Sequence, residues 1–210
     1  MVNLAQTYLF RMVNIQNIPH ILTHGITHSM SANSNPAFVP IGDSSLISTR
    51  SRYMLSNGKQ LGDYIPFYFG GRTPMLYVIQ KGFNMVTPTK PESIVYCVTS
   101  IQAIVNSNLD YVFTDGHAVD SFSSLYYPAD IDKLDNIIDW NSVKAKYWRD
   151  DHDLDRKRKK EAEFLVLGDI PISTILGYVV YNEKAKNELL AFGIDEANVI
   201  IKVDPINYYF

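Results

Sequence analysis

The sequence predicts an α+β fold, and three observations lead to this class. Short runs of β-branched and aromatic residues outnumber long amphipathic segments, and the two kinds do not alternate as in a doubly wound parallel sheet. The chain has no internal repeat and no Gly-, Pro- or Ser-rich linker that would divide it. Its 210 residues are enough for one sizeable core. We therefore expect a single mixed domain over residues 1–210.

The first quarter of the chain predicts a strand, a short helix and a long loop. A strand over 8–13 leads into a turn that begins at Asn14. Pro19 stands near the start of the next helix, where its missing N–H costs little, and Gly25 ends that helix. The segment 27–45 is rich in Ser, Asn and Pro and has no periodicity. Such long loops in compact chains usually serve function.

The remaining elements follow from β-type runs and turn residues. The aromatic run 63–69 contains Pro66, which indicates a sheet edge or a bend. Short helices with aromatic anchors are expected over 131–148, and a further helix lies between Asn182 as its N-cap and Gly193 as its stop. Strands are predicted over 63–69, 75–79, 94–99, 111–113, 175–181 and 199–203, and from Glu163 onward.

Composition narrows the class of protein. A hydrophobic content of 46% with 20% charged residues is typical of a globular chain, and a net charge of −3 confines any nucleic-acid contact to local patches. Cys97 is the only cysteine and lies in an apolar run, so we expect a buried thiol. The N-terminus lacks a basic and apolar leader, and no apolar run reaches about 18 residues. We expect a cytoplasmic protein without membrane contact.

Several familiar site motifs are absent from the sequence. There is no P-loop, no G-x-G-x-x-G and no G-x-S-x-G. A D-x-D-x-D run ends at Asp155, but Arg156 and Ala162 stand where a calcium loop needs glycine and glutamate. Three histidines have helical spacing, yet Gly25 interrupts them and no acidic ligand is nearby: His20, His24 and His28. The sequence therefore predicts no metal site.

The most distinctive feature of the sequence is a run of five consecutive cationic residues. This basic run, residues 156–160, leads directly into Glu161, Ala162 and Glu163 and then into an apolar segment. The cations would attract an anionic ligand. Burial of Glu163 is implied by the apolar residues after it, and buried glutamate is rare unless paired or functional. A solvated charge run before an ordinary strand matches the same pattern.

Other candidate residues have equally plain alternatives. Arg50 and Arg52 could be surface charges, and His117 after Asp115-Gly116 could cap a helix. Glu161 could be a solvated partner of the lysines before it. The residue pattern alone leaves these alternatives open.

Ordered motifs along nearly the whole chain resemble the DarT family, bacterial toxins that attach ADP-ribose from NAD to DNA bases. In chain order, the motifs are Asn17-Ile18-Pro19 with Ile21-Leu22 and Gly25-Ile26, Ile41-Gly42-Asp43 followed by Arg50, the aromatic run 63–69, Pro74-Met75-Leu76, residues 112–118 and residues 162–166.

The resemblance implies an ADP-ribosyltransferase fold, with two small sheets packed around an NAD cleft and short flanking helices. It implies Glu163 and Arg50 as catalytic residues, and a loop over about 140–162 that recognises the target. The expected NAD-binding residues are Arg11, Asn14, Asn17, Gly25, Arg50, Tyr68, Met75 and His117. The expected DNA-binding residues are His117, Trp148, Arg156, Lys157, Arg158 and Lys159.

The chemistry agrees with these residues. Breaking the bond between ribose and nicotinamide develops a sugar cation, which the carboxylate of Glu163 would stabilise. A target base must be unpaired to reach such a site, so single-stranded DNA is the expected substrate, with thymine favoured and guanine possible. Glu161→Ala should be milder than Glu163→Ala, and Arg50 should matter more than Arg52. Asn14 departs from the family, many of whose members carry histidine there.

The family also implies a macrodomain-type antitoxin that removes the modification, and we expect a monomer. Two alternatives remain from the sequence. One is a nucleic-acid binding module without catalysis, which the basic run and its aromatic neighbours would support. The other is an ADP-ribosyltransferase of the same fold that modifies RNA or protein.

Overall fold

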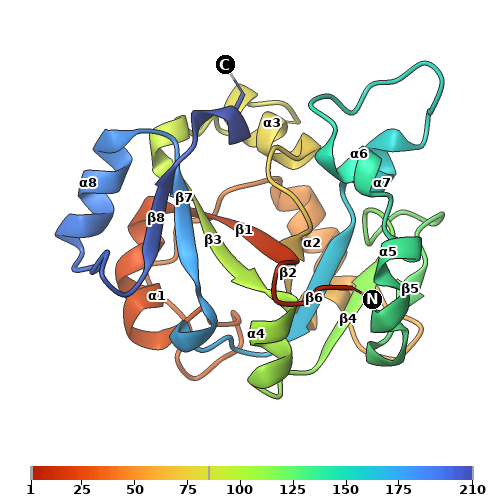
Figure 1. Cartoon of the computed structure of the whole chain (residues 1–210), viewed down its shortest axis with the longest axis horizontal. Coiled ribbons are helices and arrows are strands. Elements are labelled where there is room, and N and C mark those ends of the chain that lie inside the picture. Colours follow the sequence, from red (N-terminus) through yellow and green to blue (C-terminus); the bar gives the residue numbers. More distant parts are fainter. Residues whose placement is uncertain (1, 85, 210) are drawn as a thin grey trace.

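The computed structural model describes residues 2–84 and 86–209, and it contains one eight-stranded sheet surrounded by short helices (Figure 1). The order of strands is β5-β4-β6-β2-β1-β3-β7-β8. The strands are β1 (Tyr8–Asn14), β2 (Tyr64–Tyr68), β3 (Ile94–Ser100), β4 (Tyr111–Thr114), β5 (Leu125–Tyr126), β6 (Glu163–Leu167), β7 (Gly177–Val180) and β8 (Ile200–Val203). The helices are α1 (Ile18–His24), α2 (Ser44–Arg52), α3 (Pro74–Lys81), α4 (Ile101–Asn106), α5 (Leu134–Ile137), α6 (Trp140–Lys144), α7 (Arg156–Lys160) and α8 (Glu183–Ala191).

The sheet consists of two halves that meet at a narrow junction. Neighbouring strands are antiparallel except β7 and β8. β1 pairs with β3 along its whole length, but it pairs with β2 only through Phe10 and Tyr68. The α+β class is confirmed. The two small sheets that the resemblance implied are thus two halves of one sheet, joined by a single register pair.

The junction explains the place of Pro66 within β2. Pro66 pairs with Leu165 of β6, while its carbonyl oxygen accepts a hydrogen bond of 3.0 Å from the guanidinium of Arg11 on β1. A side chain therefore occupies the side of β2 where a continuous ladder would place backbone groups. Proline is tolerated there because that side of the strand behaves as an edge.

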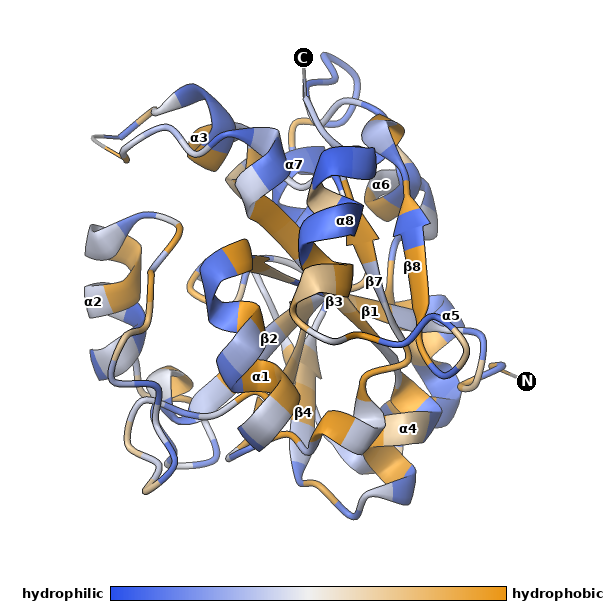
Figure 2. Cartoon of the chain, turned by 90° about the vertical axis from the view of Figure 1, so that its left-hand side faces the viewer, coloured by the Kyte–Doolittle hydropathy of each residue, from blue (hydrophilic) through white to orange (hydrophobic). Residues whose placement is uncertain are grey.

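One large apolar core spans both halves of the sheet. Leu9, Phe67, Phe113 and Phe164 are fully buried in it, and each such side chain contributes about 1.5–3 kcal/mol relative to exposure. In Figure 2 the strands are mostly orange, while α7 and α8 are mostly blue. Figure 1 places α8 beside β7 and β8, and α5, α6 and α7 beside β4 and β6. Cys97 is buried, as expected, and burial raises the pKa of its thiol to about 12.

The predicted strand over 75–79 is wrong, because this segment is the helix α3. The side chain of Thr73 accepts a hydrogen bond from the backbone N–H of Leu76, and Pro74 occupies the first turn. Leu76 and Ile79, three residues apart on one helical face, are buried together with Pro74. A short apolar run does not distinguish strand from helix, and the capping residues before it were the better signal. None of the described helices is both long and apolar enough to cross a membrane.

Gly25 joins α1 to the long loop before α2. Its φ is 77°, and its backbone N–H donates to Ile21 with a length of 2.8 Å. The next residue, Ile26, forms an isolated bridge with Ile170. A Cβ at position 25 would overlap the carbonyl oxygen of Ile170. Gly168 has nearly the same φ, 78°, but nothing lies within 4 Å of the position its Cβ would take.

These two glycines have similar φ values but differ in their surroundings. Gly168→Ala should cost about 1–2 kcal/mol, the strain of a positive φ alone. Gly25→Ala should cost more than about 3 kcal/mol, because its ψ of −167° lies in a region essentially restricted to glycine and because the bridge to Ile170 must also move. Urea unfolding of both variants measures the difference. Equal losses would show that neither the ψ value nor the packing at Gly25 adds to the cost.

Candidate active site

Glu163 occupies the first position of β6 and is fully buried. Its carboxylate accepts three hydrogen bonds. Two come from the guanidinium of Arg50, with lengths of 3.0 Å to Oε1 and 2.8 Å to Oε2, and the third is a 3.0 Å bond from the backbone N–H of Ala118 to Oε1. The parallel pair of bonds from Arg50 is the bidentate geometry that fixes both side chains. The backbone N–H of Glu163 itself donates to Thr114 Oγ1 at 3.2 Å.

Arg50 reaches Glu163 from the last turn of α2. This helix begins at Asp43, whose carboxylate accepts hydrogen bonds from the backbone N–H groups of Ser45 and Leu46. The side chain of Arg50 is 16% exposed. Arg52 follows two positions later, is exposed and donates to Ser48 Oγ. Helical geometry therefore turns Arg50 toward the sheet and Arg52 away from it.

Each member of this pair keeps the other ionised. Burial alone would raise the pKa of Glu163, but the charge and hydrogen bonds of Arg50 outweigh burial, and the pKa is lowered. Burial likewise opposes the charge on Arg50, yet Glu163 raises the pKa of Arg50 above its ordinary value. Arg50 therefore cannot accept a proton during a reaction.

His117 lies beside this pair, in the loop that follows β4. Its backbone N–H donates to the carbonyl of Arg158 at 3.0 Å, which ties the loop to α7. Burial lowers the pKa of the His117 imidazole; the charge of Glu163 opposes this shift and that of Arg50 adds to it. The ring is therefore neutral at neutral pH.

Tyr68 and Arg11 complete the cluster at the junction of the two sheet halves. Tyr68 pairs with Glu163 across β2 and β6. Burial, followed by the charges of Glu163 and Glu161, raises the pKa of Tyr68 well above its usual range, so its hydroxyl stays a donor. Burial lowers the pKa of Arg11 to about 10, and Arg50 contributes to that shift. The buried Nε of Arg11 has no hydrogen-bond partner.

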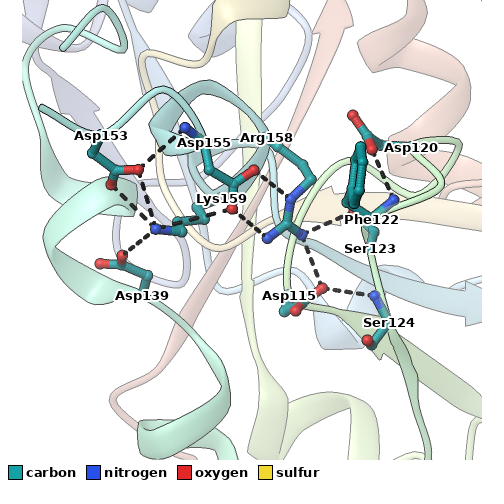
Figure 3. A network of polar contacts seen from close by, with 10 residues as sticks. All are labelled: Asp115, Asp120, Phe122, Ser123, Ser124, Asp139, Asp153, Asp155, Arg158 and Lys159. Atoms are coloured by element: carbon teal, nitrogen blue, oxygen red, sulfur yellow. Dashed lines mark hydrogen bonds and ion pairs between the residues drawn. The ribbon is translucent and has the colours of Figure 1, made fainter. Parts of the chain in front are cut away.

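Three of the five side chains of the basic run are paired with carboxylates, and Figure 3 shows two of them, Arg158 and Lys159. Arg158 forms ion pairs of 2.7 Å with Asp155 and 3.1 Å with Asp115. Lys159 lies 3.2 Å from Asp153. The other ion pairs of the run are Arg156–Asp150, Lys159–Asp139 and Lys159–Asp155. In the described part of the chain, Lys157 is the exposed cation of the run that forms no ion pair.

Lys160 has a different role from its neighbours. Its side chain is buried, and Nζ donates to the backbone carbonyls of Val143 at 2.9 Å and Ala145 at 2.6 Å. Burial lowers the pKa of Lys160 to about 8. These bonds join the end of α6 to the end of α7, so both ends of the intervening loop are fixed.

The structure brings together only part of the expected site. Five expected residues form the cluster at the junction: Arg11, Arg50, Tyr68, His117 and Glu163. Others lie elsewhere. Asn14 caps the turn after β1, buried Asn17 bonds to both backbone groups of Val39, Met75 lies in α3 and Gly25 ends α1. Trp148 packs edge-on against Tyr77 and Tyr209.

Two backbone contacts of Glu163 were not predicted from the sequence. Thr114 and Ala118 lie on either side of His117 in the 112–118 motif, so the motif that predicted His117 also contains both of these contacts. The three histidines with helical spacing, His20, His24 and His28, form no metal site among the residues that the structure describes. The Nε2 atom of His20 instead lies 3.0 Å from the carbonyl oxygen of Asn33. The described residues contain no group of three or more His, Cys, Asp or Glu side chains that could hold a metal ion.

Comparisons with known proteins agree with this geometry. The family model "ssDNA thymidine ADP-ribosyltransferase, DarT" matches residues 10–210. The chain is 33% identical to a DNA ADP-ribosyl transferase of Thermus sp. strain 2.9, over 88% of this chain and 86% of the relative. It is 31% identical to one from Escherichia coli O127:H6, covering 89% and 86%.

Solved structures match along nearly the whole chain. The structure of Thermus sp. 2.9 DarT in complex with ADP-ribosylated ssDNA superimposes with a TM-score of 0.83 and 29% identity, covering 97% of this chain and 96% of that one. The same protein in complex with NAD+ gives a TM-score of 0.79 and 28% identity, covering 97% and 98%.

The ion pair predicts unequal effects of the two neighbouring arginines on stability. Arg50→Ala should lower the free energy of unfolding by about 3–5 kcal/mol at pH 7, because Glu163 loses its partner in a buried position. Arg52→Ala, the matched control, should cost less than about 0.5 kcal/mol. Denaturant unfolding of both variants tests this, and similar losses would mean that the pair does not stabilise the fold.

The pH dependence gives a second readout. The folded pKa of Glu163 lies below its unfolded value, so the contribution of the pair is present above about pH 4.3 and is lost on further acidification. Without Arg50, burial raises the pKa of Glu163, so the variant loses stability as the pH rises above about 4.3. The stability gap between wild type and Arg50→Ala should therefore widen as the pH rises above about 4 and be smallest below it.

Proposed function

The chain belongs to the DarT family of DNA ADP-ribosyltransferases, and we propose that it transfers ADP-ribose from NAD to thymine in single-stranded DNA and releases nicotinamide. NAD is its co-substrate. The target base is the finer part of this proposal. It is supported by the description of the matching family model, which names thymidine.

The buried pair of Glu163 and Arg50 is the observation that carries the proposal. Departure of nicotinamide leaves positive charge on the ribose, and a fixed carboxylate is the group that stabilises such a cation. Three hydrogen bonds hold the Glu163 carboxylate in place, so little reorganisation is needed during the reaction. Arg50 and Glu163 are the proposed catalytic residues.

Arg11 supports binding of the NAD diphosphate near this pair. Burial and the charge of Arg50 lower the pKa of Arg11, so the two guanidinium groups repel each other, and the buried Nε of Arg11 lacks a hydrogen-bond partner. An anion placed there would satisfy the Nε–H and would relieve the repulsion between the two cations. Tyr68 and His117 are proposed to contact the nicotinamide end. Asn14, Asn17, Gly25 and Met75 remain proposed NAD-binding residues on family grounds.

DNA is proposed to approach over the loop between α6 and α7. Lys157 is the best-placed phosphate contact, because it is exposed and forms no ion pair with a described residue. Arg156, Arg158 and Lys159 must exchange carboxylate partners for phosphate if they contact the strand directly. Trp148 and His117 are proposed to contact bases, which in single strands are free to stack.

A macrodomain-type antitoxin is the proposed partner of a monomeric toxin in the cytoplasm. One relative, from Thermosipho africanus, is named a fusion of DNA ADP-ribosyl transferase and DNA ADP-ribosyl glycohydrolase. This chain is 30% identical to it over 96% of its own length and covers 49% of that protein. Such a fusion agrees with a transferase and a reversing enzyme that act together.

A single assay tests the proposed reaction against the alternatives. Labelled NAD is offered with thymine-containing single-stranded DNA, with the same DNA lacking thymine, with RNA and with protein. We expect label only on the thymine-containing DNA, and none after Glu163→Ala, with Arg52→Ala as a control that retains activity. Label on guanine, RNA or protein would show that this molecule, and not thymine in DNA, is the target. Binding of DNA without any labelled product would indicate a non-catalytic module.

Salt dependence tests the phosphate contact at Lys157. One phosphate contact to a single strand changes the slope of log K against log salt by about 0.7. Lys157→Gln should therefore flatten the slope by about 0.7, whatever the DNA sequence. Lys184→Gln on α8 makes the same charge change on another face and should leave the slope unchanged. An unchanged slope for Lys157→Gln would place the phosphates elsewhere.

A further inference from the structure

A pocket of about 730 Å³ lies between α7 and the loop after β4 that carries His117. Its size is within the range of pockets that hold small ligands, so a single nucleobase can be accommodated. Phe122 and Leu154 are both strongly exposed at this pocket. The residues that line it are His117, Asp120, Phe122, Leu154, Asp155, Lys157, Arg158 and Glu161.

Glu161 is the member of this pocket that the proposed reaction has not used. Only 7% of it is exposed, yet its carboxylate accepts no hydrogen bond and forms no ion pair with any residue in the described ranges. Glu163, two residues later, accepts three hydrogen bonds. The Glu161 carboxylate therefore lines the pocket with its oxygens available to a ligand, and little-exposed ionisable groups in a pocket are frequent at functional sites.

The proton on the target nitrogen needs an acceptor that the ion pair cannot provide. Arg50 stays protonated, and the carboxylate of Glu163 is occupied and has a lowered pKa. His117 also lines the pocket, but the lowered pKa of its imidazole makes it a weaker base. Burial raises the pKa of Glu161 to about 7, partly opposed by Lys157. A pKa near the working pH is best suited to general base catalysis.

We propose that Glu161 is the general base of the transfer, accepting the ring N–H proton of the target base in this pocket. This inference rests on the proposed function. The ring nitrogen forms a bond to C1′ of the ribose, while the bond from C1′ to nicotinamide breaks and its electron pair leaves with nicotinamide. The proton of the ring N–H passes to the carboxylate of Glu161. Glu163 stabilises the ribose cation, so the two carboxylates have separate tasks.

Several ionisable groups set the charge around Glu161. They are Lys157 and Lys160 of α7, Glu163 of β6, Tyr68 of β2, Tyr209 near the C-terminus, Arg158 of α7, and Asp120 and His117 of the loop after β4. The base must be ionised to act, so transfer should rise with pH through about 7 and then level off. Burial lowers the pKa of Lys160 to about 8, close to that of Glu161, but the hydrogen bonds of Lys160 to two backbone carbonyls do not involve Glu161.

The test compares two reactions of Glu161→Gln, which keeps the shape of the side chain and removes the base. Transfer to a thymine-containing single strand should fall by about 100-fold or more. Cleavage of NAD without DNA, which needs no ring nitrogen, should stay within about threefold of wild type. The rise of transfer through pH 7 should disappear, and part of the activity should return at alkaline pH, where the ring N–H ionises unaided. Glu183→Gln, an exposed carboxylate of α8, is the control for the charge change.

Folding is checked in the same variant. The folded pKa of Glu161 exceeds its unfolded value, so wild type loses stability as the pH rises from about 4 to 7. Glu161→Gln should not show this loss and should be the more stable protein at pH 8. Glu161→Asp keeps a carboxylate and should retain the rise of transfer with pH at a lower rate.

Each contrary outcome has a distinct meaning. Wild-type transfer rates and the same pH profile in Glu161→Gln would overturn the role of Glu161 alone. A parallel loss of NAD cleavage would also overturn it, because Glu161 would then act on NAD. Loss of the pH profile in His117→Asn, but not in Glu161→Gln, would make His117 the base. A wild-type protein that cleaves NAD but labels no DNA would overturn the proposed function together with this role.

Discussion

The buried ion pair between Arg50 and Glu163 is the constraint on which the rest of the site depends. A carboxylate with no exposure requires a counter-charge, and Arg50 supplies it by packing the last turn of α2 toward the first residue of β6. That packing fixes the end of the long loop before α2. It also places Glu163 beside the narrow junction of the sheet. Tyr68 pairs with Glu163 there, and Arg11 donates a hydrogen bond to the carbonyl oxygen of Pro66.

Two carboxylates separated by one residue have opposite environments. Glu163 accepts three hydrogen bonds and its pKa is lowered, while Glu161 has no hydrogen bond or ion pair with a described residue and burial raises its pKa to about 7. Such divergence is the usual mark of groups with different chemical tasks in one site. Ala162, buried between them, holds both in the short connection from α7 to β6.

The sequence predicted the class of fold, the strand after Glu163 and the likeness to the family, because these depend on local runs and on ordered motifs. It could not supply the pairing of Arg50 with Glu163 from local pattern, since 113 residues separate them. The same limit applies to the basic run, whose partners Asp115 and Asp139 come from other parts of the chain. The run was interpreted as a group of cations that would attract an anionic ligand, whereas three of its five side chains form ion pairs with carboxylates.

Lys160 has a consequence for how this enzyme class can diversify. Its amino group ties Ala145 and Val143 to the end of α7, and none of residues 146–155 is buried. Asp150, Asp153 and Asp155 pair with the cations of α7, but changes at the other positions of this segment alter the exposed surface without breaking those ion pairs. New target preferences can therefore arise by drift in one exposed stretch, while selection on the reaction itself acts on a separate set of positions.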